Sequence, residues 1–178
     1  MKKEISVRAL RVTQTGVMVA LLIALQALTK PAGQYVTGSC VNAVLAVTAL
    51  TAGLWSALAV AALSPFCAFF LGIGPQLLPV VPSIAAGNIV FAALLFFLSE
   101  GGEAPLWRRT AGWLAAAAAK FGVLYLLVVK LLCTVLALKE AQTAALTAMF
   151  SYPQLVTALV GGGIALVLAP VLKKALKR

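Results

Sequence analysis

The sequence contains no histidine, and its three cysteines, Cys40, Cys67 and Cys133, are far apart. Neither a CxxC pair nor a histidine-containing ligand set can form from such spacing, which argues against a zinc site or a histidine-ligated haem. We therefore expect no metal and no cofactor, and we interpret the cysteines as small apolar packing residues. The most common general base is also missing, so we expect no enzyme, although a serine paired with a lysine would provide a nucleophile.

Charge is scarce as well. Charged residues make up 10% of the 178 residues, 63% are hydrophobic, and the mean hydropathy is +1.08. Soluble domains usually carry charge on about a quarter of their residues. The composition therefore predicts a single integral membrane domain over residues 1–178. The net charge of +10 does not indicate a nucleic-acid partner, because ten of the fourteen basic residues flank hydrophobic runs, as in membrane topology signals.

The hydrophobic runs predict an all-α bundle of six transmembrane helices, at residues 12–29, 40–54, 56–73, 82–98, 111–137 and 154–172. The run over 41–73 is too long for one span, and Gly53, Trp55 and Ser56 interrupt it, so we interpret it as a tight helical hairpin. Lysine and arginine are concentrated at both termini, which places both in the cytoplasm and requires an even number of spans. Residues 30–40 are expected to form a loop, and residues 139–154 another loop containing a short interfacial helix.

Acidic residues are the scarcest charged type. All four are glutamates (Glu4, Glu100, Glu103 and Glu140) that fall in termini or predicted loops. Carriers driven by protons or sodium commonly use carboxylates within the membrane. There is also no Walker A pattern for nucleotide binding. We therefore expect that this chain does not power transport by itself.

Two lysines interrupt the fifth span. Lys120 is expected near the membrane midplane and Lys130 near its outer boundary. At about 100° per residue the two lie about 80° apart around the helix axis, so both are expected to face the bundle interior. A charged side chain within the membrane is interpreted as part of a functional site by default. The alternatives are that Lys130 extends to the lipid headgroups and that Lys120 only donates hydrogen bonds to backbone carbonyls or to Asn88.

Other polar residues gather toward the predicted outer half of the bundle. Each alone is a weak signal, since buried asparagines often only join helices and tyrosines favour membrane interfaces. Together they are typical of a pocket with a few convergent polar groups. The candidate substrate-binding residues are Lys120, Lys130, Asn88, Asn42, Tyr35, Gln34, Tyr125 and Gln154.

Small residues at four-residue spacing indicate close helix contacts. In the sixth span, Ala158, Gly161, Gly162 and Ala165 are predicted to pack inside the bundle. For Ala20 and Ala24 of the first span, the residues alone leave internal packing and contact with another protein equally open. The three tryptophans, Trp55, Trp107 and Trp113, are expected to anchor helices at the cytoplasmic interface.

Several segments together resemble the substrate-binding S components of energy-coupling factor (ECF) transporters. They are AxxxA at Ala20 and Ala24, TGSCVNAVL at 37–45, LSPFCAFFLGIGPQLLPVVP at 63–82, AAGNIVFA at 85–92, and YPQLVTALVGGGIALVLAPVLKKAL at 152–176. The resemblance covers nearly the whole chain and depends on the order and spacing of these segments.

The resemblance implies a multi-pass protein of the bacterial plasma membrane that binds a vitamin-like micronutrient near the outer face. By the same resemblance, the loop between the first two spans would help to cover the ligand. The implied partners are a transmembrane coupling protein and two cytosolic ATPases, and Ala20 and Ala24 would contact the coupling protein. S components are mutually divergent, so the substrate does not carry over, but the lysines favour an anionic or acceptor-rich one.

Three other interpretations stay open at this point. A structural or scaffolding membrane protein would have no ligand pocket, and its lysines would be occupied by carbonyl groups. A self-sufficient facilitator would transport without any ATPase. A small membrane enzyme would place a nucleophile within reach of one of the two lysines.

Overall fold

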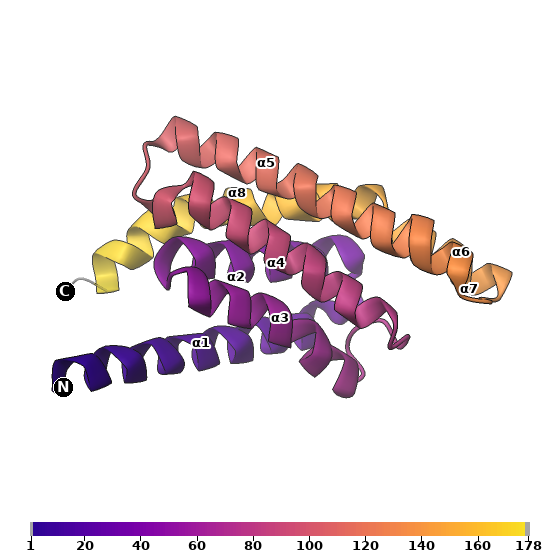
Figure 1. The fold of residues 1–178 in the computed structure, drawn as a ribbon, viewed down its shortest axis with the longest axis horizontal. Coiled ribbons are helices and arrows are strands. Elements are labelled where there is room, and N and C mark those ends of the chain that lie inside the picture. The colour runs from indigo at the N-terminus through magenta and orange to yellow at the C-terminus, as the bar shows by residue number, and fades with distance from the viewer. Residues whose placement is uncertain (1, 177–178) are drawn as a thin grey trace.

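The computed structural model describes residues 2–176, and among these it contains helices and loops but no strand. Figure 1 shows the long helices packed in one bundle, with the start of the first helix and the end of the last one at the same end. The elements are α1 (Lys2–Thr29), η1 (Lys30–Ala32), α2 (Gln34–Thr51), α3 (Leu54–Phe70), α4 (Val80–Leu98), η2 (Glu100–Gly102), α5 (Leu106–Leu124), η3 (Tyr125–Leu132), α6 (Cys133–Val135), α7 (Glu140–Phe150) and α8 (Tyr152–Leu176).

Four segments of the described chain are long and apolar enough to span a membrane. By length and composition, Ala9–Ala32, Val80–Leu98, Leu106–Val135 and Glu140–Ala175 can each cross a bilayer. Helix α3 is apolar but has only 17 residues, and α2 is not among the four. The sequence-based expectation of six helices thus agrees with the fold, while only four of them meet the length and hydropathy expected of an ordinary span.

The predicted hairpin is confirmed. Helices α2 and α3 are separated only by Ala52 and Gly53, and Gly53 has φ of 90°, a backbone conformation that favours glycine. The short helix predicted within residues 139–154 is also present, as α7. The predicted loop over residues 30–40 is wrong beyond Gly33, because α2 already begins at Gln34. Gly33, with φ of 87°, makes the turn that allows the chain to re-enter a helix so early.

Helix α2 lies at the centre of the bundle and packs against α1, α3, α4 and α8. Its contact with α8 is close because α8 has no side chain at Gly161. A Cβ atom there would collide with the backbone of Ser39 and Ala43. The predicted internal packing of the small residues in α8 is therefore confirmed, and Ala158 and Ala165 are fully buried.

Trp113 differs from its predicted role as an interfacial anchor. Its indole lies against Gly162 and Gly163 of α8, and its Nε1 donates a hydrogen bond to the Ala158 carbonyl at 3.2 Å. The two glycines leave the space that the ring occupies, so Trp113 joins α5 to α8. Trp55 and Trp107, by contrast, are largely exposed.

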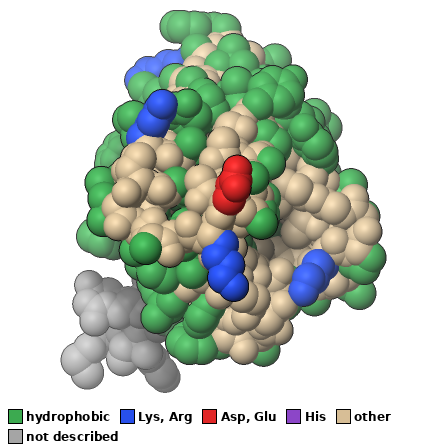
Figure 2. Space-filling view, turned by 90° about the vertical axis from the view of Figure 1, so that its right-hand side faces the viewer, with side chains coloured by type: hydrophobic (Ala, Val, Ile, Leu, Met, Phe, Trp, Pro, Cys, Tyr) green, Lys and Arg blue, Asp and Glu red, His purple; other side chains and the backbone are tan. Residues whose placement is uncertain are grey.

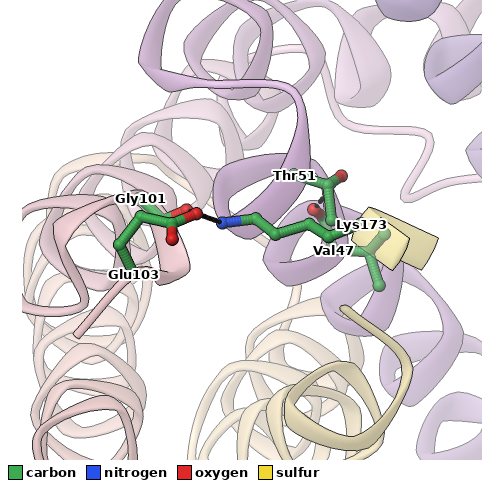
Figure 3. Close-up of polar contacts among 5 residues, drawn as sticks. All are labelled: Val47, Thr51, Gly101, Glu103 and Lys173. Carbon is green, nitrogen blue, oxygen red and sulfur yellow. Dashed lines mark hydrogen bonds and ion pairs between the residues drawn. The ribbon is translucent and has the colours of Figure 1, made fainter. Parts of the chain in front are cut away.

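At the end of the bundle that holds the termini, the last turn of α8 is tied to the segment between α4 and α5. Lys173 Nζ donates to the Gly101 carbonyl at 2.8 Å and pairs with the Glu103 carboxylate (Figure 3). Gly102, with φ of 88°, lies so close to the end of α2 that a Cβ would come within 2.8 Å of the Leu50 carbonyl oxygen. Helices α2, α4 and α8 are thus held together at this end.

Candidate functional site

A cavity of about 330 Å³ lies toward the opposite end of the bundle. Figure 2 views the molecule from that end, where a few basic side chains and an acidic one stand among hydrophobic and uncharged atoms. The cavity walls come from every main helix, from α7, and from the loops that follow α1 and α3. The polar residues that line it are Gln26, Lys30, Gln34, Thr37, Asn42, Ser64, Asn88, Lys120 and Gln154.

Lys120 is the most buried charged side chain in the cavity wall, with 3% of its surface exposed. It lies midway along the continuous helical segment Leu106–Val135. Its ammonium donates to Asn42 Oδ1 at 2.6 Å and to Asn88 Oδ1 at 2.7 Å, and it lies 5.6 Å from the centre of the Phe91 ring. These bonds use two of its three N–H donors.

Asn42 is held in place by further hydrogen bonds. Its Nδ2 donates to the Gly38 carbonyl at 2.9 Å and to Thr157 Oγ1 at 3.2 Å, and Thr157 in turn donates to the Gln154 carbonyl. Gly38 makes this possible because the Thr157 side chain lies directly against it. Because its amide nitrogen already donates to these two groups, the Asn42 side chain is oriented with its oxygen toward Lys120. Helices α2, α4, α5 and α8 therefore all contribute to the position of the ammonium group.

No acidic side chain accompanies Lys120 among the described residues. The recorded ion pairs join Arg108 to Glu100 and Lys173 to Glu103, both outside the cavity. Lys30 is a second basic residue in the cavity lining. Asparagine oxygens hydrogen-bond to an ammonium group but do not neutralise its charge. The described lining is therefore basic without a compensating carboxylate, which is a costly arrangement in an apolar setting.

Among the described residues, two buried side-chain atoms of the lining have no hydrogen-bond partner. They are Gln26 Oε1 at the end of α1 and Ser64 Oγ in α3, and both atoms are buried. The Ser64 side chain is 1% exposed and sits beside Pro65, which also lines the cavity. Buried polar groups in folded proteins nearly always have partners, so such atoms at a cavity wall indicate where a ligand would bind.

The cavity brings together five of the eight predicted substrate-binding residues: Gln34, Asn42, Asn88, Lys120 and Gln154. Lys130, Tyr125 and Tyr35 do not line it. Tyr35 is 52% exposed and instead lines an apolar groove between α1, α2 and α8. That any of these residues contacts a substrate stays a prediction.

Lys130 does not face the bundle interior as expected. Its side chain is exposed, and its Nζ lies 5.6 Å from the Tyr125 ring centre on the outside of the same helix. The expectation assumed an α-helical register throughout, but residues Tyr125–Leu132 form a π-helix. Its i→i+5 hydrogen bonds place more residues in each turn, so the angle between the two lysines cannot be taken from an α-helix.

Gln26, Lys30 and Ser64 are cavity residues that the sequence reasoning did not select. Gln26 is a long polar side chain inside the first apolar run, but Gln14 is another, so the sequence did not single out Gln26. Lys30 was assigned to a loop, and no local pattern distinguishes Ser64 from the other serines. Their grouping depends on the packing of α1 against α3, which no local pattern reveals.

Ala20 and Ala24 are exposed on α1. The structure therefore does not support internal packing of this face. Gly16, one turn earlier, is also exposed, and a Cβ added there would meet nothing within 4 Å. The three positions follow one another at four-residue spacing, so they lie on one open face of α1.

Comparison with known proteins found no match to a family model, a curated protein or a solved structure.

Proposed function

We propose that this chain binds a small, water-soluble anionic molecule inside a membrane-embedded helical bundle, and that it serves as the S component of an ECF-type importer. The observation that carries the proposal is Lys120: a buried ammonium group, in a cavity wall, without a carboxylate partner. An anionic ligand would supply the missing charge and accept the third hydrogen bond.

The network around Lys120 supports a binding role because it fixes the ammonium before a ligand arrives. Two asparagine oxygens hold the group from α2 and α4, and the lysine itself comes from α5. Pre-organised donors lose little freedom on binding, which favours high affinity. The cavity volume lies at the lower end of the range for small-molecule sites. Both features favour the binding of a small molecule.

The transport part of the proposal rests on the sequence resemblance and on the position of the acidic residues, since the four described spans carry a carboxylate only at Glu140, the first residue of its span. The exposed face with Ala20 and Ala24 is where the coupling protein would dock, and two cytosolic ATPases would supply the energy. The membrane would be the bacterial plasma membrane.

A purely structural role for the bundle is the second candidate, because Asn42 and Asn88 already occupy Lys120 as helix-joining hydrogen bonds would. Native mass spectrometry of the detergent-purified protein separates the two. A small molecule bound one to one, and identified after denaturation, supports the binding role. Protein that carries no molecule, and is not stabilised by any member of a panel of small carboxylates and vitamins, refutes it and favours the structural role.

A further inference from the structure

The two sides of the cavity have different chemistry. Lys120 and its asparagine partners come from α5, α4 and α2. Gln26 and Ser64 come from α1 and α3, which pack against each other. Figure 1 shows α1 and α3 on one side of the bundle and α5 on the other. The cavity therefore has a buried cation, Lys120, on one side. The side formed by α1 and α3 has an amide oxygen and a hydroxyl, and the exposed Lys30 follows α1.

The wall formed by α1 and α3 is incomplete without a further polar group. Gln26 Oε1 and Ser64 Oγ are buried and have no hydrogen-bond partner, whereas Asn42, Gln154 and Thr157 nearby are all paired. A carbonyl oxygen can only accept, and a hydroxyl can both donate and accept. A group that satisfies both atoms must therefore bring at least one O–H or N–H hydrogen.

We infer that the ligand of this cavity has two ends: an anionic group that contacts Lys120, and a hydroxyl or N–H group at the far end that pairs with Gln26 and Ser64. This inference rests on the proposed function. The cavity volume limits the part of the ligand that the cavity can enclose. At about 30 Å³ for each water-sized group, the cavity holds roughly 11 such groups. The ligand class is a compact hydroxy acid, amino acid or amide acid.

A paired library tests the far end. It contains small carboxylic acids with a terminal hydroxyl, amine or amide, each matched with the analogue that has a methyl group in its place. Binding of every pair to the purified protein is measured by thermal shift and calorimetry. Among acids that bind, we expect the donor-bearing member to bind at least tenfold more tightly, because the methyl analogue leaves buried polar atoms unpaired.

Two substitutions test whether the preference for the donor-bearing member comes from Gln26 Oε1 and Ser64 Oγ. Ser64→Ala and Gln26→Leu should each reduce the preference for the donor-bearing member to about threefold or less. They should leave the binding of the methyl analogues nearly unchanged. Ser39→Ala is the matched control, since its hydroxyl bonds to the Tyr35 carbonyl and lies outside this cavity. Equal binding of both members to the wild type, or a preference that survives both substitutions, overturns the inference.

If the proposed function is wrong, the same experiments give a different result. If no carboxylate of the library binds, or if carboxylates bind equally to Lys120→Met, Lys120 has no ligand role and the inference falls with it.

A readout without ligand adds a second test. Ser64→Ala removes an unpaired hydroxyl from the empty protein, so its thermal midpoint should equal or exceed that of the wild type. A clear drop in the midpoint would show that the hydroxyl already has a structural partner, and would overturn its assignment to the ligand.

Discussion

Replacing Lys120 by methionine removes the buried charge while keeping a side chain of similar length. A hydrogen bond to a charged group contributes about 1.5–3 kcal/mol. Because about 1.4 kcal/mol corresponds to a tenfold change in affinity, Lys120→Met should weaken binding of an anionic ligand by roughly 10- to 150-fold. The ligand to use is the carboxylate that stabilises the wild-type protein most.

The effect on folding should be smaller than the effect on binding, because two contributions oppose each other. Asn42 Oδ1 and Asn88 Oδ1 each lose a donor, which costs about 1–3 kcal/mol per unsatisfied buried atom. The protein also loses a desolvated charge, which recovers several kcal/mol. We expect a net change in the free energy of unfolding of at most about 2 kcal/mol in either direction.

Isothermal titration calorimetry and thermal unfolding in the same detergent measure the two quantities. Lys130→Met is the matched control, because Lys130 lies in the same segment but is exposed and outside the cavity. Its affinity should equal that of the wild type. The reasoning is refuted if Lys120→Met binds the ligand normally, or if both methionine variants lose affinity to the same extent.

Three further predictions concern the frame around the cavity. Gly161→Leu should destabilise the fold by about 1–3 kcal/mol, because the leucine side chain would collide with the α2 backbone. Gly16→Ala should stabilise the fold by up to about 1 kcal/mol, because alanine favours a helix and its Cβ meets nothing there. Thermal unfolding measures both changes. Asn88→Ala should lower the free energy of unfolding by about 1.5–3 kcal/mol in the wild type and by less in Lys120→Met. Equal losses in the two backgrounds would show that the Lys120–Asn88 hydrogen bond contributes nothing to stability. Ala24→Trp should leave ligand binding intact but abolish uptake in cells that express a coupling module, and normal uptake would exclude this face as the docking site.

Features that depend on local chemistry were predictable from the sequence. Gly53 marked the hairpin, and the glycines of α8 marked a close helix contact. Lys120 stood out because a charge inside an apolar run needs partners. Of its two acceptors, Asn88 was predicted as a possible acceptor for Lys120, and Asn42 as a candidate site residue. In each case the residue type is tolerated in only a few structural environments, so its presence in the sequence predicts the local structure.

Features that depend on helix register or on distant packing were not predictable. The composition of Tyr125–Leu132 does not distinguish a π-helix from an α-helix, so the direction predicted for the Lys130 side chain was wrong. Trp113 was assigned to the interface because it stands near the start of a span, but the space it fills is created by Gly162, 49 residues later. Gln26 and Ser64 came together only through the packing of α1 on α3.

The loops beside the cavity are joined by one recorded side-chain hydrogen bond, from Lys30 Nζ in η1 to the Gly72 carbonyl at 2.8 Å. The donor is charged, but the bond is exposed to water, so it contributes little to holding the two loops together. A molecule arriving from water would meet almost no delay there. Long residence would then have to come from the buried contacts, and capture and retention would depend on different residues.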